Sequence, residues 1–521
     1  MIKSLVKQGE YFDSVSLMIV GKEISKLEGV EDATVVMATA ENKAILQTAN
    51  LYLPEFASYK DTDLLIVIKT ADDDNIDELF AAVEQLLSDI RHHKDESGSF
   101  SPKSLQGALQ KQPESNLVLI SLAGRFAGKE AMKALQNGLN VMLFSDNVPL
   151  QTEIELKKYA VEKNLLVMGP DCGTAIINQV ALAFSNSVQK GDIGLVAASG
   201  TGLQEITSLI SEEGFGISQA IGTGGRDIKK EVGGLMFLSG IDLLAQDDET
   251  KVIVLISKPP AAEVLAKINH KISKIDKPIV TIFLGATEPQ AANKNLVFCK
   301  NLQEAALKAC ALSNQSELSA VDKFLAEQQQ ECQKIAADNF PKIGKKRRYL
   351  RGLFTGGTLC DEMQIILQQA GIEIYSNRAR EDKYKLADNW QSQKHTLLDM
   401  GEDEFTVGRL HPMMDFELRN KRILQEAETA ETAIIFLDLV LGYGAHPDPL
   451  AENLPIIQKA QSIAPDILFI CSVTGTQADP QNREQIIQTL QENGVIVLPS
   501  NAAGAETIKE LIKKIERERE E

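Results

Sequence analysis

Apolar runs and amphipathic stretches alternate along most of the chain, and the two clearest examples are residues 193–205 and 351–362. Each segment holds a short apolar run, then a turn rich in Ser, Thr and Gly, then an amphipathic stretch. A glycine, Gly214 or Gly371, closes each stretch before a new apolar run begins. Because this order is typical of buried strands joined by helices, it predicts the same strand–turn–helix–strand unit twice.

The turn in each unit is a candidate binding site for phosphate or carboxylate. Small residues at the start of a helix leave its first backbone N–H groups open, and the helix dipole favours negative charge there. The alternative is that both turns are ordinary connections of a parallel sheet. Because the Gly-Thr signature occurs twice, we favour a paired anion site. Its candidate residues are Ser199, Gly200, Thr201, Gly356, Gly357 and Thr358.

The same alternation predicts an α/β chain of several domains, as a length of 521 residues leads us to expect. Repeated strand–helix units predict parallel sheets, wound in one case as in the Rossmann class. The predicted domains are 1–96 (small α+β), 102–190 (Rossmann-like), 191–312 and 349–517 (both flavodoxin-like), with the polar, helical segment 313–348 as an interdomain linker.

In the Rossmann-like domain, the turns that follow the strands form a second candidate site. Strand carboxyl ends in such a sheet face the ligand crevice. The first turn does not fit GxGxxG, so a dinucleotide site is only weakly indicated. The candidate residues at this rim are Arg125, Ser145, Asn147 and Cys172. For Cys172, a role as a small buried hydrophobe is the alternative.

Charge and composition narrow the possible partners. The formal net charge of −19 argues against nucleic acid and against an anionic membrane surface. We find no signal peptide and no apolar run long enough to cross a membrane, so we expect a cytoplasmic protein. The six cysteines lie far apart without a CxxC pair, which predicts reduced thiols and no metal site.

Two histidines are candidates for proton transfer or phosphate contact. His411 and His446 both precede proline in loops after apolar runs, and an aspartate lies near each; Asp448 is the candidate beside His446. A surface turn is the alternative for each histidine. The candidates for binding an anionic substrate are Arg226, Arg409 and Asn501, with a surface salt bridge as the alternative for the arginines.

Several motifs resemble those of a known superfamily. Residues 167–172, the turn at 199–201, the segment 222–225, and the segments 354–357 and 442–444 resemble parts of succinyl-CoA synthetase, an NDP-forming acyl-CoA synthetase. The whole chain resembles the FdrA family more closely. Its specific motifs lie at 13–18, 143–148, 408–415 and 442–449.

This resemblance implies a CoA-binding-type domain at 102–190 and two ligase domains at 191–312 and 349–517, with the two turns facing each other. Two departures from the synthetase are visible. The loop that would carry the phosphorylated histidine, 285–292, has no histidine. The glutamate that partners this histidine in the synthetase would fall within 257–260, where this chain has Ser-Lys-Pro-Pro. No block for an ATP-grasp domain precedes 349. We therefore expect that this chain alone does not pass phosphate to a nucleotide.

Resemblance to the FdrA family implies a function in allantoin breakdown. The chain would be a subunit of an oxamate carbamoyltransferase, which converts oxalurate and phosphate to oxamate and carbamoyl phosphate. Phosphate is then a co-substrate, no cofactor is required, and CoA binding is left open. Separate partner subunits, an oligomeric state and a downstream carbamate kinase are also expected. The alternatives are an acyl-CoA ligase and a non-catalytic scaffold subunit that holds anions.

Overall fold

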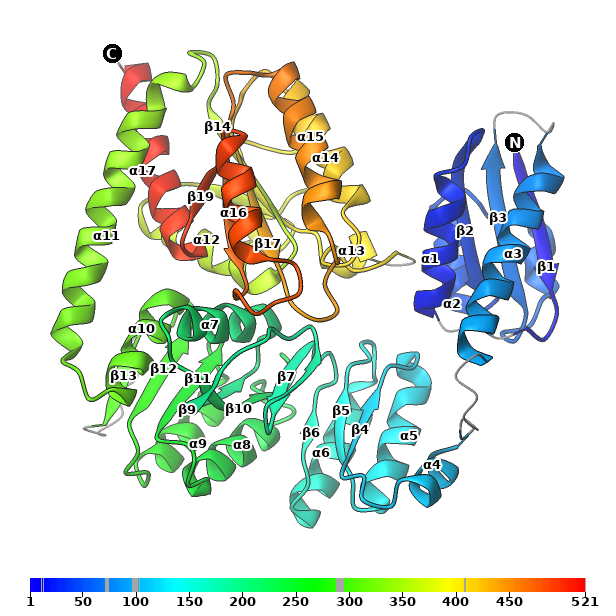
Figure 1. Ribbon diagram of the computed structural model, residues 1–521, viewed down its shortest axis with the longest axis horizontal. Helices are drawn as coiled ribbons and strands as arrows, with labels where there is room; N and C mark the ends of the chain where they lie inside the picture. The colour runs from blue at the N-terminus through cyan, green and yellow to red at the C-terminus, as the bar shows by residue number, and fades with distance from the viewer. Residues whose placement is uncertain are drawn as a thin grey trace. The chain divides into compact units, whose positions relative to one another are not determined.

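The computed structural model describes residues 1–10, 12, 14–70, 75–95, 102, 104–286, 295–406 and 409–520 (Figure 1). The chain forms two compact units. The first consists of Met1–Lys111 and Glu402–His411, and the second of Gln112–Gly401 and Pro412–Glu521.

The first unit is the predicted small α+β domain. Its three strands form an antiparallel sheet in the order β1-β3-β2. Alternate residues of the strands face α1 and α3 on one side and α2 and a 3-10 helix on the other, as period-two alternation requires. The elements are β1 (Ile2–Lys7), α1 (Ser14–Ser25), β2 (Val30–Met37), α2 (Ala40–Thr48), η1 (Pro54–Ser58), β3 (Leu64–Thr70), α3 (Ile76–Asp95), α4 (Leu105–Lys111) and α13 (Asp403–Thr406).

The second unit begins with a short Rossmann-like layer. Its three strands are parallel in the order β4-β5-β6, and α5 and α6 connect them. These elements are β4 (Leu117–Ile120), α5 (Gly124–Gln136), β5 (Asn140–Leu143), α6 (Leu150–Lys163) and β6 (Val167–Met168). The next hairpin, β7 (Thr174–Ile177) and β8 (Val180–Ala183), pairs with β10 of the following sheet, although it lies within 102–190 in sequence.

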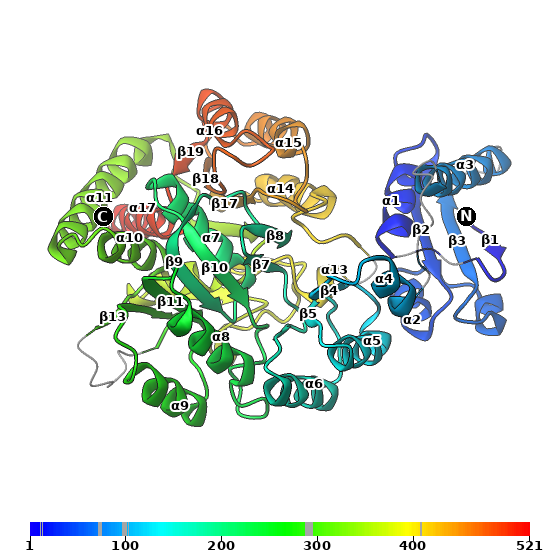
Figure 2. The ribbon, with the colours of Figure 1, turned by 60° about the horizontal axis from the view of Figure 1, so that its bottom comes forward.

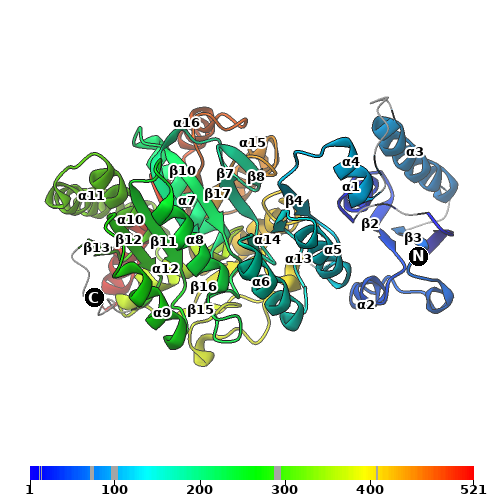
Figure 3. The same cartoon turned by 90° about the horizontal axis from the view of Figure 1, so that it is seen from below.

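The following sheet has seven strands in the order β13-β12-β11-β9-β10-β7-β8. Helices α7 and α10 cover one face, and α8 and α9 cover the other (Figure 3). Strands β13, β12, β11, β9 and β10 are parallel to one another, whereas β7 is antiparallel to both β10 and β8. The elements are β9 (Lys190–Ala197), α7 (Gly200–Glu212), β10 (Ile217–Gly222), α8 (Leu235–Gln246), β11 (Val252–Ser257), α9 (Ala262–Ile272), β12 (Ile279–Phe283), β13 (Leu296–Phe298) and α10 (Leu302–Ser313).

A second, fully parallel sheet has six strands in the order β15-β16-β14-β17-β18-β19. Helices α12 and α17 pack on one face, and α14 packs on β14 and β17. The elements are β14 (Tyr349–Phe354), α12 (Gly357–Gln369), β15 (Ile374–Ser376), η3 (Asp382–Tyr384), β16 (His395–Asp399), α14 (Glu417–Glu428), β17 (Thr432–Val440), α15 (Pro449–Ile463), β18 (Leu468–Thr474), α16 (Arg483–Glu492), β19 (Ile496–Leu498) and α17 (Asn501–Glu520).

One apolar core continues across both large sheets. It includes buried side chains of α7 and α10 from the first sheet and of α12 and α17 from the second. Helix α11 (Leu318–Asn339), followed by η2 (Phe340–Lys342), lies along α17 beside α10 (Figures 1 and 2). It buries Cys332 and Ala336, so the segment expected to be a linker is a packed helix.

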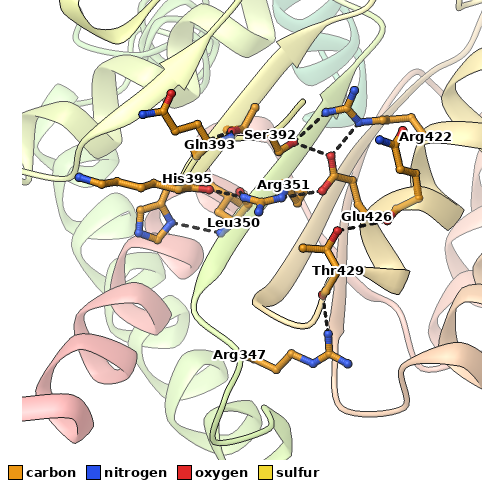
Figure 4. Close-up of polar contacts among 12 residues, drawn as sticks. Arg347, Leu350, Arg351, Ser392, Gln393, His395, Arg422, Glu426 and Thr429 are labelled. Atoms are coloured by element: carbon orange, nitrogen blue, oxygen red, sulfur yellow. Dashed lines mark hydrogen bonds and ion pairs between the residues drawn. The ribbon is translucent and has the colours of Figure 1, made fainter. Parts of the chain in front are cut away.

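A buried ion cluster lies where the six-stranded sheet begins, at the amino ends of its strands (Figure 4). Glu426 of α14 accepts from Arg351 Nε at 2.7 Å and from Arg422 Nε at 2.7 Å. The hydroxyl of Ser392 also donates to Glu426. One carboxylate thus lies between two arginines, and all three charges are almost fully buried.

Candidate anion-binding site

The N-termini of α7 and α12 face each other between the two large sheets. Ser199 Oγ and Thr358 Oγ1 lie 2.7 Å apart, and the backbone N–H of Thr358 donates to Thr201 Oγ1 at 3.4 Å. The approach is close enough that a Cβ at Gly356 would lie 2.7 Å from Thr201 Cγ2. The six residues of the two predicted turns are therefore brought together.

Three backbone donors remain open at this meeting point. Ser199 Oγ caps α7 by accepting from the N–H of Gly202 at 3.1 Å. Within the described residues, the N–H groups of Gly200, Thr201 and Gly357 donate to no protein acceptor. Gly200 is exposed and Gly357 is half-buried, whereas Thr201 is buried. Open N–H groups at the positive end of a helix dipole are the feature that binds anions in other proteins.

A buried carboxylate already lies behind α12. Asp438 of β17 accepts from the N–H of Thr355 at 2.7 Å and of Gly356 at 3.0 Å. Arg419 of α14 donates to Asp438 Oδ1 at 3.2 Å. Burial raises the pKa of Asp438, and Arg419 opposes this. The pair fixes the turn before α12. We did not predict this role, although a single aspartate inside the apolar run 432–440 is a signal for it.

A second carboxylate lies at the start of α12. Asp399, at the end of β16, approaches Gly357 so closely that a Cβ there would be 2.4 Å from Asp399 Oδ2. The Nη1 atom of Arg378 is 3.4 Å from Asp399 Oδ2, and its Nη2 atom is 3.3 Å from Asp361 Oδ2. Lys258, which follows β11 of the other sheet, is 2.6 Å from Asp361 Oδ2. None of these four side chains was predicted from the sequence.

Two glutamates bond α7 and α12 to helices of the opposite sheet. Glu205 of α7 accepts from the N–H of Asn501, the first residue of α17, at 3.2 Å. Glu362 of α12 accepts from the N–H of Leu302, the first residue of α10, at 2.7 Å. Each carboxylate thus caps a helix of the opposite sheet. Burial raises the pKa of both, that of Glu362 to about 7.

Asn501 and Arg226 form bonds inside the fold. Asn501 is fully buried, and its Nδ2 donates to Glu362 Oε2 at 2.7 Å and to the carbonyl of Leu359 at 3.0 Å. Arg226 Nε lies 2.8 Å from Glu153 Oε2 of α6, and its Nη2 donates to the carbonyl of Val148 at 2.8 Å. These two of the three predicted substrate-binding side chains therefore join elements within the second unit.

The two candidate histidines belong to different units. His446 Nδ1 accepts from the N–H of Asp448 at 3.1 Å, so the ring proton is on Nε2, which is 3.9 Å from Glu452 Oε1. Asp448 caps α15 by accepting from the N–H of Ala451 at 3.1 Å. His411 lies in the first unit with the exposed Arg409. Burial lowers the pKa of His411 to about 4, so it is neutral at pH 7.

The four rim candidates of the Rossmann-like layer differ in accessibility. Arg125 and Asn147 are exposed, and the Arg125 guanidinium lies 4.8 Å from the centre of the Phe126 ring. Ser145 is buried, and its Oγ accepts from the N–H of Leu122 at 2.9 Å. Cys172 is buried, which raises the pKa of its thiol to about 12. Its environment is that of a small buried hydrophobe.

In the described part of the chain, no helix is long and apolar enough to cross a bilayer. Nor do three or more His, Cys, Asp or Glu side chains gather there in a way that could hold a metal ion. All six cysteines are buried and free.

Three family models match the chain. The CoA-ligase model matches residues 353–511, the CoA binding domain model 188–285, and the model named AllF, heavy metal-associated domain, 1–102. The matched ranges leave 103–187 uncovered, which includes most of the segment expected to be of CoA-binding type. Residues 1–102 contain no cysteine, so the donors there do not fit a thiolate metal site.

Several relatives and solved structures are similar to parts of the chain. The Methylorubrum extorquens malate–CoA ligase subunit alpha is 30% identical over 180 residues, 32% of this chain and 58% of that protein. The Acholeplasma ADP-forming sulfoacetate–CoA ligase subunit SqwL is 28% identical over 200 residues, 36% of this chain and 64% of that protein. A solved Korarchaeum cryptofilum dinucleotide-forming acetyl-CoA synthetase 1 gives a TM-score of 0.29 at 15% identity, covering 78% of this chain and 83% of that one.

One relative spans nearly the whole chain. The Escherichia coli protein YahF, described as uncharacterized, is 42% identical over 519 residues, 98% of this chain and 99% of that protein. The CoA-ligase and CoA-binding matches assign a ligase-type fold to the parts of the second unit that they cover. The chain belongs to the FdrA-type family of succinyl-CoA synthetase-like proteins, of which YahF is a relative.

Proposed function

We propose that the protein acts in an acyl-CoA ligase-type enzyme and transfers an acyl group between the thiol of CoA and phosphate. The observation that carries this proposal is the set of three open N–H donors where α7 and α12 meet. The ligase names of the relatives favour this reaction over the carbamoyl transfer that the sequence led us to expect.

The geometry suits the charge changes of such a transfer. Phosphate oxygen attacks the thioester carbonyl carbon, and negative charge builds on the carbonyl oxygen before the C–S bond breaks. Backbone N–H groups that are already oriented stabilise this charge without reorganising. Gly200, Thr201 and Gly357 supply such donors, and two helix dipoles add to their field.

We further propose that the acyl group comes from a small acid with a second anionic group. The related subunits are named for ligases of malate, succinate and sulfoacetate, and each of these acids carries two acidic groups. Arg378 lies beside Gly357 and is paired with Asp361 and Asp399, and Lys258 is paired with the same Asp361. Partner subunits would supply the nucleotide step, because the chain has no histidine in 285–292.

Carbamoyl transfer is the second candidate. In it, oxalurate and phosphate would give oxamate and carbamoyl phosphate, and a separate carbamate kinase would use the product. The missing histidine in 285–292 favours this reaction too, since it needs no phosphorylated protein group. The same N–H donors would act in both reactions.

The test is an arsenolysis assay on the purified full chain. Succinyl-, malyl- and acetyl-CoA are each incubated with arsenate, and the released CoA thiol is measured. We expect arsenate to release CoA from succinyl-CoA and malyl-CoA, whose acyl groups keep one carboxylate, faster than from acetyl-CoA. This release should be lost in a Ser199→Ala/Thr358→Val double variant. Oxalurate cleavage to oxamate instead would favour carbamoyl transfer. Phosphate binding without turnover of any substrate would identify a scaffold subunit and refute the proposal.

A further inference from the structure

Four charged side chains from both large sheets meet beside the N-terminus of α12. Lys258 and Arg378 share Asp361 Oδ2, at 2.6 Å and 3.3 Å. Arg378 also reaches Asp399 Oδ2 at 3.4 Å. The two carboxylates are buried, whereas Lys258 is exposed. The charges alternate in the order Lys258, Asp361, Arg378 and Asp399. Asp399 is the one that lies beside Gly357 of the candidate anion site.

The carboxylate of Asp399 is held in one orientation. Its Oδ1 accepts from the N–H of Gly401 at 2.9 Å. Its backbone N–H donates to Asn377 Oδ1 at 3.0 Å, and its carbonyl accepts from Asn377 Nδ2 at 2.8 Å. These bonds direct Oδ2 towards Gly357, where a Cβ would lie only 2.4 Å away. Glycine is needed at 357 to admit this carboxylate, and the N–H of the same residue is one of the three open donors.

The surroundings let Asp399 gain and lose a proton near neutral pH. Burial, and after it the nearby carboxylates of Asp361 and Asp438, raise the pKa of Asp399 to about 6. Arg378 and the N–H of Gly401 oppose these effects. A group with this pKa is mostly ionised at pH 7, yet it takes a proton readily.

We propose that Asp399 moves the proton in the acyl transfer at this site, an inference that rests on the proposed function. Its carboxylate accepts the proton of hydrogen phosphate as the phosphate oxygen bonds to the thioester carbonyl carbon. The C–S bond breaks, and Asp399 then donates the proton to the sulfur of the departing CoA thiolate. The products are an acyl phosphate and CoA thiol, and Asp399 returns to its ionised form.

Arg378 is the positioning residue for this step. It contacts Asp399 and Asp361 and lies 3.4 Å, at Cζ, from a Cβ position on Gly357. Removing its charge raises the pKa of Asp399, because Arg378 favours the ionised carboxylate. We therefore expect the acid limb of the pH–rate profile to move to higher pH when Arg378 is neutralised.

The experiment compares Asp399→Asn, Arg378→Met and the exposed control Asp382→Asn with the wild-type chain. We expect Asp399→Asn to lower kcat for phosphate-dependent acyl-CoA cleavage about 100-fold or more and to remove the acid limb near pH 6. Phosphate binding, measured by calorimetry, should persist in Asp399→Asn, which shows that the site is intact. Asp382→Asn should behave as wild type.

A second readout needs no turnover. Carbon-13 NMR of aspartate-labelled protein, with Asp399→Asn to assign the signal, follows the carboxyl of Asp399 with and without inorganic phosphate. We expect titration near pH 6 and an upward shift on phosphate binding. Wild-type kcat in Asp399→Asn, or a titration that phosphate leaves unchanged, would overturn the inference. If the wild-type chain cleaves no acyl-CoA but shows the NMR shift, the proposed function fails rather than the placement of Asp399.

Discussion

The hydroxyls of Ser199 and Thr358 lie 2.7 Å apart, and each belongs to the first turn of a different helix and to a different sheet. The contact brings the positive ends of α7 and α12 together. Like ends of helix dipoles repel each other, so this arrangement is favourable when an anion shares it. An anion placed between the two helix ends would offset this repulsion.

A double-mutant cycle measures the contact directly. Ser199→Ala removes both the contact and the cap on Gly202, and Thr358→Val keeps the shape of the side chain while removing the hydroxyl. We expect a coupling free energy of about 1 kcal/mol between the two substitutions in denaturant unfolding. Purely additive effects would show that the hydroxyls do not interact.

Glu362 gives the stability of the protein a dependence on pH. Burial raises its pKa in the folded chain to about 7, above the unfolded value of about 4.3. The folded state therefore binds more protons between these values, and the contribution of Glu362 to stability is greatest at low pH and falls as pH rises through 7. The full change is about 4 kcal/mol, from the shift of the Glu362 pKa at about 1.4 kcal/mol per unit.

The measurement is urea unfolding at a series of pH values for wild type, Glu362→Gln and the exposed control Glu492→Gln. The difference in unfolding free energy between wild type and Glu362→Gln should change with pH between about 4 and 7. The Glu492→Gln curve should run parallel to that of the wild type. A constant offset for Glu362→Gln would contradict the raised pKa.

The Glu426 cluster should contribute strongly to stability. Glu426→Ala would leave Arg351 and Arg422 buried without their shared carboxylate (Figure 4). Breaking a buried ion pair by removing one partner costs about 3–5 kcal/mol. Thermal or chemical unfolding should show this loss. Glu417→Ala, on the exposed side of the same helix, is the matched control and should cost well under about 1 kcal/mol.

Lys157 should hold the Rossmann-like layer to the seven-stranded sheet. Its ammonium lies 2.8 Å from Glu153 and 2.9 Å from Asp227, and all three are fully buried. Lys157→Met would leave two buried carboxylates near each other and should cost about 3–5 kcal/mol. The neighbouring, exposed Lys158→Met is the control. Equal stabilities of the two variants would contradict this role.

Sequence patterns predicted the parts of the fold that depend on local order. Apolar runs, glycines and small residues placed both strand–turn–helix units, because these signals lie within about fifteen residues of each other. The pairing of β7 with β10 was not predicted, since the hairpin is contiguous in sequence with the Rossmann-like layer. The polar α11 was expected to be a linker because only one narrow stripe of it, including Cys332 and Ala336, is buried.

The sequence predicted the two turns of the candidate site but not the charged side chains around them. The charges around it come from side chains far apart in sequence. Asp399 contacts the start of α12 at Gly357, which lies 42 residues earlier in the chain. Lys258 pairs with Asp361, which lies 103 residues later. No periodicity encodes such pairs. The histidines drew attention as residue types, yet His411 belongs to the other compact unit and His446 is bonded within its own loop.

Calorimetric titration with inorganic phosphate at pH 7 tests the central claim most directly. The wild-type chain should bind phosphate, and Gly357→Ala should weaken binding about tenfold or more, because the new Cβ would lie 2.4 Å from Asp399 Oδ2 at the open donors. Gly107→Ala, where a Cβ would meet its nearest atoms at 3.4 Å, should bind as wild type does. Equal phosphate affinity in wild type and Gly357→Ala, or no binding by the wild type, would contradict an anion site between the two helices.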